Sequence, residues 1–149
     1  MKEHSLDEVV CLIFVEDGKF LLEERLDHGV EKGDWTTTGG KVSESDRKSD
    51  GDYIENASIR ESEEETGLTP TKMRLFTSFR QMTKKGVEYI FHGVHVEAWS
   101  GELKNDEVDV QTGLARRHLE WIEKERARIL VRDHLVDSRI FSDFLTNSR

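Results

Sequence analysis

Three glutamates lie close together in the stretch RESEEETGL, residues 60–68, at Glu61, Glu64 and Glu65. On an α-helix, residues three and four positions apart are surface neighbours, so the three carboxylates share one face. Like charges at this spacing cost about 0.2–0.5 kcal/mol per pair, and the negative end of the helix dipole lies nearby. The cluster therefore predicts a bound cation, although a solvated acidic helix face has the same pattern.

The helix that carries the glutamates has a predicted start and a predicted end. Asp52 opens the capping-box pattern Asp-x-x-Glu, so the helix should begin at about residue 53. Gly67 suits a left-handed C-cap, and Pro70, the one proline of the chain, bars continuation. Ile54 and Ala57 precede the glutamates on the same face, so we expect the acidic face to point inward.

The surrounding elements are mostly strands. Runs of apolar and β-branched residues predict strands at 8–16, 19–25, 72–83, 87–99 and 118–122. Asp17-Gly18 is a two-residue hairpin signal between the first two strands. Apolar residues at helical spacing predict a helix at about 133–146. Strands around one helix, closed by another, predict a mixed α/β layer structure.

Two segments are predicted to be irregular. Gly39-Gly40 breaks the β-favouring run Trp35–Thr38 and would let the backbone approach another group closely. Residues 43–51, SESDRKSDG, are polar and of low complexity. We expect this segment to be a mobile surface loop that buries no side chain.

Composition limits the class of protein. The 149 residues show no evident linker, which predicts one domain over 1–149. A net charge of -9 disfavours long nucleic acids and anionic membranes as partners, so an anionic ligand would need metal ions or a few placed Arg and Lys residues. The single cysteine, Cys11, lies in the apolar run VVCLIFV, which excludes an intrachain disulfide and is too short to span a membrane. We expect a cytoplasmic protein.

The segment around the glutamates resembles the signature of the Nudix hydrolases, G-x5-E-x7-R-E-U-x-E-E-x-G-U, in which U is an apolar residue. The matching positions are Gly40, Arg60, Glu61, Glu64, Glu65, Gly67 and Leu68. Ser62 departs from the pattern at an apolar position, and the distance from Gly40 to Arg60 is six residues longer than in the signature. Counting back from Arg60 places Asp52 at the first glutamate and the extra residues within 43–51.

The resemblance implies a fold and a set of site residues. The fold is an α/β/α sandwich with a central mixed sheet, a catalytic helix at about 53–66 and a C-terminal helix. The implied cofactor is Mg²⁺, or Mn²⁺ in its place, and hard oxygen ligands suit both ions. The implied metal ligands are Glu61, Glu64, Glu65, the carbonyl of Gly39 and Glu107 from an acidic loop. The three helix glutamates with Arg60, which orients them, form the implied catalytic set. The candidate substrate-binding residues are Arg25, Lys41 and Gly40. For Arg25, Lys41 and Glu107 an ordinary surface charge is the alternative interpretation.

The implied reaction is attack of a metal-activated water on a diphosphate linkage in a small-molecule nucleotide. We expect a nucleoside triphosphate, intact or damaged, to yield the monophosphate and pyrophosphate, because the chain is small and has no N-terminal extension. A nucleotide sugar, ADP-ribose or a dinucleoside polyphosphate is the alternative substrate. A non-catalytic nucleotide-sensing module would be expected to lose the glutamates, which are all present. A homodimer is left open.

Overall fold

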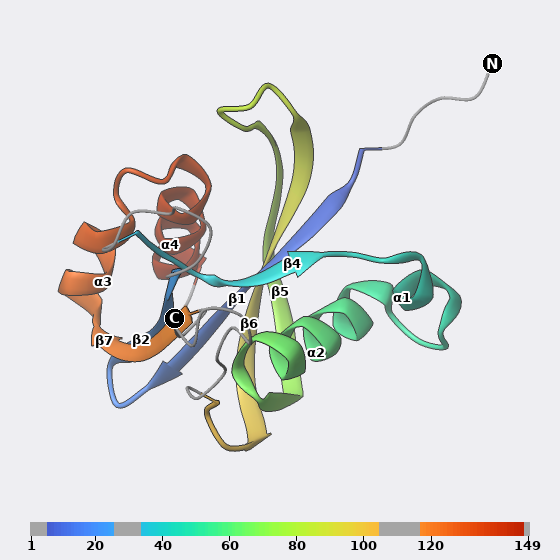
Figure 1. Ribbon diagram of the computed structural model, residues 1–149, viewed down its shortest axis with the longest axis horizontal. Coiled ribbons are helices and arrows are strands. Elements are labelled where there is room, and N and C mark those ends of the chain that lie inside the picture. The colour runs from blue at the N-terminus through green and yellow to red at the C-terminus, as the bar shows by residue number, and fades with distance from the viewer. Residues whose placement is uncertain (1–5, 26–33, 105–116, 148–149) are drawn as a thin grey trace, which may run out of the picture.

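The computed structural model describes residues 6–25, 34–104 and 117–147. Within these ranges four strands are followed by two helices, and three further strands are followed by two more helices (Figure 1). The strands are β1 (Glu8–Glu16), β2 (Lys19–Arg25), β3 (Trp35–Thr36), β4 (Thr38–Lys41), β5 (Leu68–Met82), β6 (Glu88–Gly101) and β7 (Arg117–Glu123). The helices are α1 (Glu44–Lys48), α2 (Tyr53–Thr66), α3 (Lys124–Val131) and α4 (Leu135–Asn147). None of the described helices is long and apolar enough to cross a membrane.

The strands form a mixed sheet in the order β3-β2-β1-β6-β5, with β4 paired to β1 and β7 paired to β2. Strands β1 and β6 are parallel, whereas the other pairs are antiparallel. Helices α1 and α2 lie on one side of the strands and α3 and α4 on the other (Figure 1). The predicted α/β/α sandwich with a central mixed sheet is therefore confirmed.

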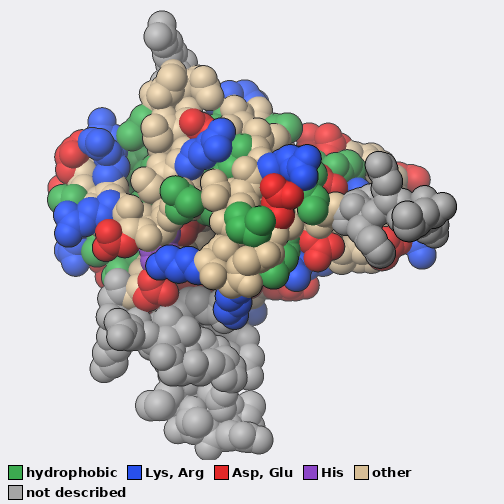
Figure 2. Space-filling view, turned by 90° about the horizontal axis from the view of Figure 1, so that it is seen from above, with side chains coloured by type: hydrophobic (Ala, Val, Ile, Leu, Met, Phe, Trp, Pro, Cys, Tyr) green, Lys and Arg blue, Asp and Glu red, His purple; other side chains and the backbone are tan. Residues whose placement is uncertain are grey.

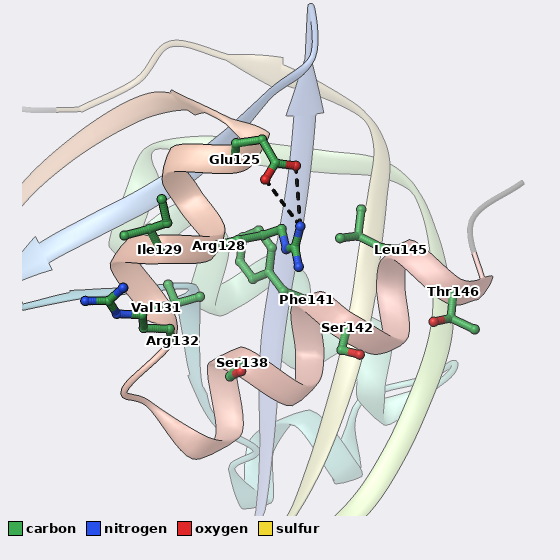
Figure 3. A pocket seen from close by; sticks show the side chains of 10 residues that line it. All are labelled: Glu125, Arg128, Ile129, Val131, Arg132, Ser138, Phe141, Ser142, Leu145 and Thr146. Carbon is green, nitrogen blue, oxygen red and sulfur yellow. Dashed lines mark hydrogen bonds and ion pairs between the residues drawn. The ribbon is translucent and has the colours of Figure 1, made fainter.

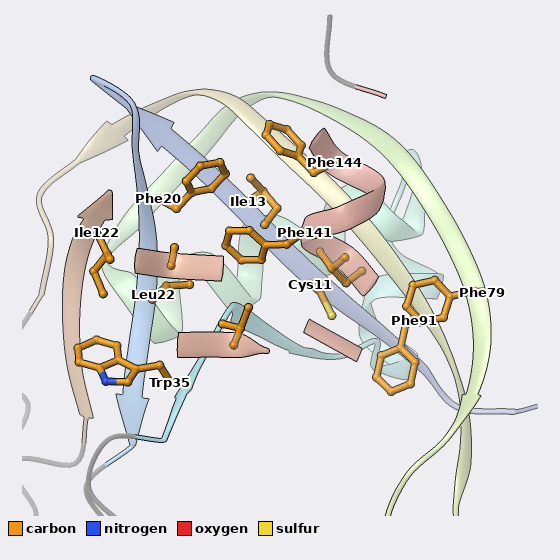
Figure 4. Packing of buried hydrophobic residues seen from close by; sticks show 13 residues of the cluster. Cys11, Ile13, Phe20, Leu22, Trp35, Phe79, Phe91, Ile122, Phe141 and Phe144 are labelled. Atoms are coloured by element: carbon orange, nitrogen blue, oxygen red, sulfur yellow. The ribbon is translucent and has the colours of Figure 1, made fainter. Parts of the chain in front are cut away.

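Strand β1 contributes to the core on both faces. Val10, Leu12 and Phe14 pack in the cluster that includes α2, while Cys11 and Ile13 pack with residues of α3 and α4 (Figure 4). Successive side chains of a strand point to opposite faces, so a strand buried on both sides must be continuously apolar. Burial of Cys11 raises the pKa of its thiol, and the charge of Asp137 adds to this effect.

Most of the predicted elements are confirmed. Asp17 and Gly18 both have positive φ angles, 53° and 73°, as a two-residue hairpin turn requires. The long strand β5 begins at residue 68, earlier than predicted, and Pro70 lies within it. Pro70 is tolerated because β5 is at the edge of the sheet and bulges at this point. Helix α3 was not predicted as a separate element.

Two predictions about local structure are wrong. Gly39 and Gly40 do not break a strand, because both pair with β1 inside β4. Gly39 has a φ of 148°, and a Cβ there would overlap the carbonyl oxygen of Val10, so glycine is needed for this pairing. The segment 43–51 is not devoid of buried side chains: it contains α1, in which Ser43 and Asp46 form a capping box and Asp46 is 4% exposed.

Candidate active site

Helix α2 has the predicted caps. The Asp52 carboxylate accepts hydrogen bonds from the backbone N–H groups of Ile54, at 2.7 Å, and Glu55, at 3.3 Å. Gly67 adopts the left-handed conformation, with φ at 81°, and its N–H donates to the carbonyl of Glu63. Because both ends are fixed, the glutamates keep a set place relative to the sheet.

Ser62, the departure from the family signature, is fully buried. Its hydroxyl donates to the carbonyl of Leu68 at 2.7 Å, and the Thr66 hydroxyl donates to the Ser62 carbonyl at 2.7 Å. These bonds tie the last turn of α2 to the first residue of β5. The serine therefore replaces apolar packing with a hydrogen bond between two elements.

The three glutamates differ in exposure. Glu61 is 8% exposed and lies directly over Gly40, where a Cβ would overlap its carboxyl group. The Glu64 side chain is 59% exposed, and Glu65 is half-buried. The prediction that the acidic face points inward is therefore right for Glu61 and wrong for Glu64, because Glu64 lies further round the helix.

Arg60 contacts more of the site than any sequence pattern indicated. Its Nε and Nη2 donate to the two carboxylate oxygens of Asp46 at 3.0 and 2.8 Å. Its Nη1 donates to Glu61 at 2.8 Å and to Glu64 at 3.4 Å. Nη2 also donates to the carbonyl of Lys41 at 2.9 Å. One guanidinium group thus joins α1, α2 and β4, and it orients two of the glutamates.

Asp46 is the residue that the sequence analysis missed. Five residues separate it from Gly40, which is the spacing of the first glutamate in the family signature. Asp46, and not Asp52, therefore holds that position, and the six extra residues follow it. Hydrogen bonds from Arg60, supported by the backbone and hydroxyl of Ser43, lower the pKa of Asp46 to about 2. Counting forward from Gly40, instead of back from Arg60, would have found it.

The electrostatics of Glu61 favour a cation. Burial raises the pKa of its carboxyl, and the charges of Glu65 and Glu64 raise it further, against the opposing effect of Arg60. A positive ion placed among these groups would offset both the cost of burying the charged carboxylate and the repulsion between the carboxylates.

The edge of β4 presents backbone carbonyl oxygens toward the three glutamates. The Val42 N–H donates to the Glu8 carbonyl, so Val42 bonds to β1. In an antiparallel pair every second residue bonds to the partner strand, so Gly40 also faces β1, whereas the carbonyls of Gly39 and Lys41 point away from it. Arg60 already binds the Lys41 carbonyl. The Gly39 carbonyl is therefore directed toward the same edge and can serve as an oxygen ligand.

The donor set has the chemistry of a site for a hard divalent cation: three carboxylates on one helix and a strand carbonyl. In the described part of the chain, no three His, Cys, Asp or Glu side chains already surround a point that a metal ion could fill. Instead, Nη1 of Arg60 lies between the carboxylates of Glu61 and Glu64. The residues fit a metal ion in type and charge, and a bound ion would share these carboxylates with Arg60.

Of the remaining predicted residues, Lys41 is not brought to the glutamates. The Lys41 ammonium lies 5.2 Å from the centre of the Tyr89 ring and 3.7 Å from Asp7. Lys41 pairs with Val9, which packs on the α4 side of the sheet, so its side chain points away from Glu61. The side chain of Arg25 and the whole of Glu107 lie outside the described residues.

A polar pair was also missed on the α4 side of β4. The carboxylate of Asp137 is buried and accepts a hydrogen bond from the Thr37 hydroxyl at 2.7 Å. Burial raises the pKa of Asp137, although the bond from Thr37 opposes this. Gly40 of β4 therefore contacts Glu61 on one side of the sheet. Thr37, the residue just before β4, binds Asp137 of α4 on the other side.

A groove of about 640 Å³ lies between α3 and α4, and its lining includes Arg128, Arg132 and Phe141 (Figure 3). Arg128 is held by Glu125 at 3.3 Å. None of the predicted site residues that the structure describes lines this groove. Among the described residues, basic and acidic side chains are interspersed on the face shown in Figure 2, so these residues form no continuous basic patch there for a nucleic acid backbone.

Comparisons with known proteins agree with this geometry. The sequence model of the NUDIX domain matches residues 4–143. No curated protein matches the chain. The Escherichia coli ORF135 protein has a similar solution structure, with a TM-score of 0.69 and 26% identity over 94% of this chain and 89% of that one.

Two further solved structures share the fold. The mutator MutT protein of Bacillus halodurans has a TM-score of 0.66 and 24% identity over 92% of this chain and 80% of that one. A UDP-X diphosphatase has a TM-score of 0.61 and 17% identity over 100% of this chain and 67% of that one. The domain match covers nearly the whole chain and includes every position of the glutamate motif, so the chain belongs to the Nudix hydrolase family.

Proposed function

We propose that this Nudix pyrophosphohydrolase cleaves a nucleoside triphosphate to the monophosphate and pyrophosphate, and that it requires Mg²⁺, with Mn²⁺ as a substitute. The observation that carries the proposal is the position of Glu61. It is buried against Gly40 and bonded to Arg60, on the same helix as Glu64 and Glu65. A buried carboxylate beside two others costs stability unless it serves a charged ligand.

The proposed ligands of the metal are Glu61, Glu64, Glu65 and the carbonyl of Gly39. A bound divalent ion lowers the pKa of its water and neutralises phosphate charge. Arg60 holds the carboxylates of Glu61 and Glu64 in place before substrate arrives. Glu64 is the most exposed of the three, which suits a group that must accept a proton from water and release it to solvent.

The choice of a triphosphate rests on the extent of the structural match. The matched domain spans 89% of the ORF135 protein and 80% of the MutT protein, but only 67% of the UDP-X diphosphatase. The match is least complete for the protein whose name gives a nucleoside diphosphate linked to a further group, which disfavours that substrate class. A nucleotide sugar, ADP-ribose or a dinucleoside polyphosphate is the second candidate, and Arg25 is proposed to contact phosphate in either case. The predicted phosphate contact of Lys41 is not part of this proposal, because its side chain lies on the other face of the sheet.

The test is a substrate panel of nucleoside triphosphates, nucleotide sugars, ADP-ribose and dinucleoside polyphosphates with Mg²⁺, with products identified by chromatography. We expect pyrophosphate from a triphosphate. Glu64→Gln and Glu65→Gln should each lower kcat at least about 100-fold. Glu63→Gln is the matched control, because Glu63 is exposed on the same helix and binds Thr69 instead.

Two results would contradict the proposal. Full activity in both Glu64→Gln and Glu65→Gln would remove the metal site from the helix. Absence of turnover on every member of the panel, with nucleotide binding retained, would favour the sensing module.

A further inference from the structure

A second polar cluster lies at the start of β1, around the nearly buried carboxylate of Glu8. Three donors from different elements converge on it. The Arg47 guanidinium from α1 binds Oε2, while the Tyr53 hydroxyl from α2, at 2.8 Å, and His92 Nε2 from β6, at 2.6 Å, bind Oε1. Ser78 of β5 contacts Nδ1 of His92 at 2.7 Å. One carboxylate therefore joins three elements besides its own strand, and His92 links β5 to the cluster.

The cluster is built to hold a charge. The Glu8 and His92 side chains are nearly buried, and the Arg47 guanidinium lies over the Tyr53 ring with its centre 4.5 Å from the ring centre. Burial disfavours the charged form of Glu8, but the hydrogen bonds from Arg47, His92 and Tyr53 outweigh it and lower the pKa of this group. The carboxylate of Glu8 and the guanidinium of Arg47 thus form a fixed ion pair.

Arg47 follows Asp46 in the sequence, and the two side chains connect α1 to different elements. Asp46 binds Arg60 on α2, whereas Arg47 binds Glu8 on β1. Helix α1 has five residues, which is too short to be stable by itself. Its place therefore depends on these two contacts and on Asn56, whose amide donates to the Asp46 carbonyl at 3.1 Å.

We propose that Arg47 and Glu8 are positioning residues, which anchor α1 to the sheet so that Asp46 is held against Arg60 and Arg60 against Glu61. This inference rests on the proposed function. It explains how the site keeps its geometry although six extra residues follow Asp46. An anchor directly before the longer connection fixes Asp46 independently of how that connection is arranged.

The test compares Arg47→Met with Lys48→Met. Lys48 is the next residue of α1, it is exposed, and it makes no ion pair within the described ranges, so its loss removes the same charge without the anchor. We expect Arg47→Met to lower kcat about tenfold at saturating Mg²⁺ and substrate, the lower end of the effect of outer-shell partners of metal ligands. Arg47→Lys should recover most of the activity, and Lys48→Met should match the parent.

Hydrogen exchange gives a readout that does not need turnover. In Arg47→Met, amides of the peptide covering residues 43–49 should exchange faster than in the parent, whereas Lys48→Met should leave them unchanged. If the parent turns over no substrate, the proposed function fails and exchange alone decides this inference. Parent-like exchange, or parent-like kcat with only a lower melting temperature, would overturn it.

A double-mutant cycle tests the route through Asp46. If Arg47 acts by holding Asp46, the variant Asp46→Asn/Arg47→Met should have nearly the kcat of Asp46→Asn alone. If the fold-losses in kcat of the two single variants multiply in the double variant, Arg47 does not act through Asp46. Glu8→Gln keeps one acceptor oxygen, which Tyr53 and His92 can share as they share Oε1, but loses the charge that faces Arg47. It should therefore reproduce the Arg47→Met exchange pattern.

Discussion

Gly40 sets how closely Glu61 can approach β4. A Cβ at this position would meet only the end of the Glu61 side chain, which can move, whereas a Cβ at Gly39 would meet the backbone of Val10. We therefore expect Gly40→Ala to displace the carboxylate and lower kcat about 10–100-fold while the melting temperature changes little. Gly39→Ala should instead lower the melting temperature. Equal kcat in Gly40→Ala and the parent would show that Glu61 does not need its observed place.

Asp46 gives a prediction about pH. Its pKa is about 2 in the folded protein, below the ordinary value of 3.8, so its contribution to stability is present above pH 4 and is lost as the pH falls toward 2. Asp46→Asn should be less stable than the parent by about 2 kcal/mol at pH 7. Urea unfolding at pH 7, 4 and 2.5 should show this difference shrinking at the lowest pH. A constant difference would mean that Arg60 does not hold an ionised Asp46.

At the scale of elements, Ser62 couples the end of α2 to β5. Ser62→Ala removes the hydroxyl that donates to the Leu68 carbonyl at a buried position, so we expect it to lower the free energy of unfolding by about 1–3 kcal/mol. Ser62→Leu restores the apolar residue of the signature but adds volume at a fully buried position, and it should also destabilise the protein. Thermal unfolding measures both. Stabilisation by Ser62→Leu would show that the site has spare room.

The elements that could be predicted from sequence are those with strong local signals. The apolar run of β1, the Asp17-Gly18 turn and the caps of α2 each determine a local conformation, and the structure has all three. Helix α1 could not be predicted from composition, because its one buried side chain, Asp46, is held by Arg60, which lies fourteen positions later in the chain. The pairing of β4 likewise depends on β1, about 28 residues earlier along the chain at Cys11 and Gly39.

The site was predicted only in part for the same reason. Glu61, Glu64 and Glu65 follow from the helix period, but which of them is buried depends on the strand beneath, where Gly40 leaves room for one carboxylate. The contact between Arg60 and Asp46 follows from the family spacing only when it is counted from Gly40. The Glu8 cluster combines residues from five segments and has no sequence signature.

At the scale of the whole molecule, a net charge of -9 means that any bound cation improves the charge balance. Mg²⁺ at about 100 times its dissociation constant should stabilise the fold by about 2.7 kcal/mol and raise the melting temperature by about 5–10 °C. The effect should be small in Glu61→Gln and unchanged in Glu63→Gln. K⁺ at matched ionic strength controls for screening of the net charge. An equal rise in Glu61→Gln would place the ion elsewhere.

The burial of Cys11 makes the protein suited to site-specific labelling. The thiol is buried in the core and its pKa is raised, so the native chain offers no reactive thiolate at neutral pH. A cysteine introduced at exposed Lys48 or Asp50 would be the single reactive group, at the junction of α1 and the longer connection. A fluorophore there would report whether α1 keeps its place when metal ions and nucleotides are added, without removing any native residue of the core.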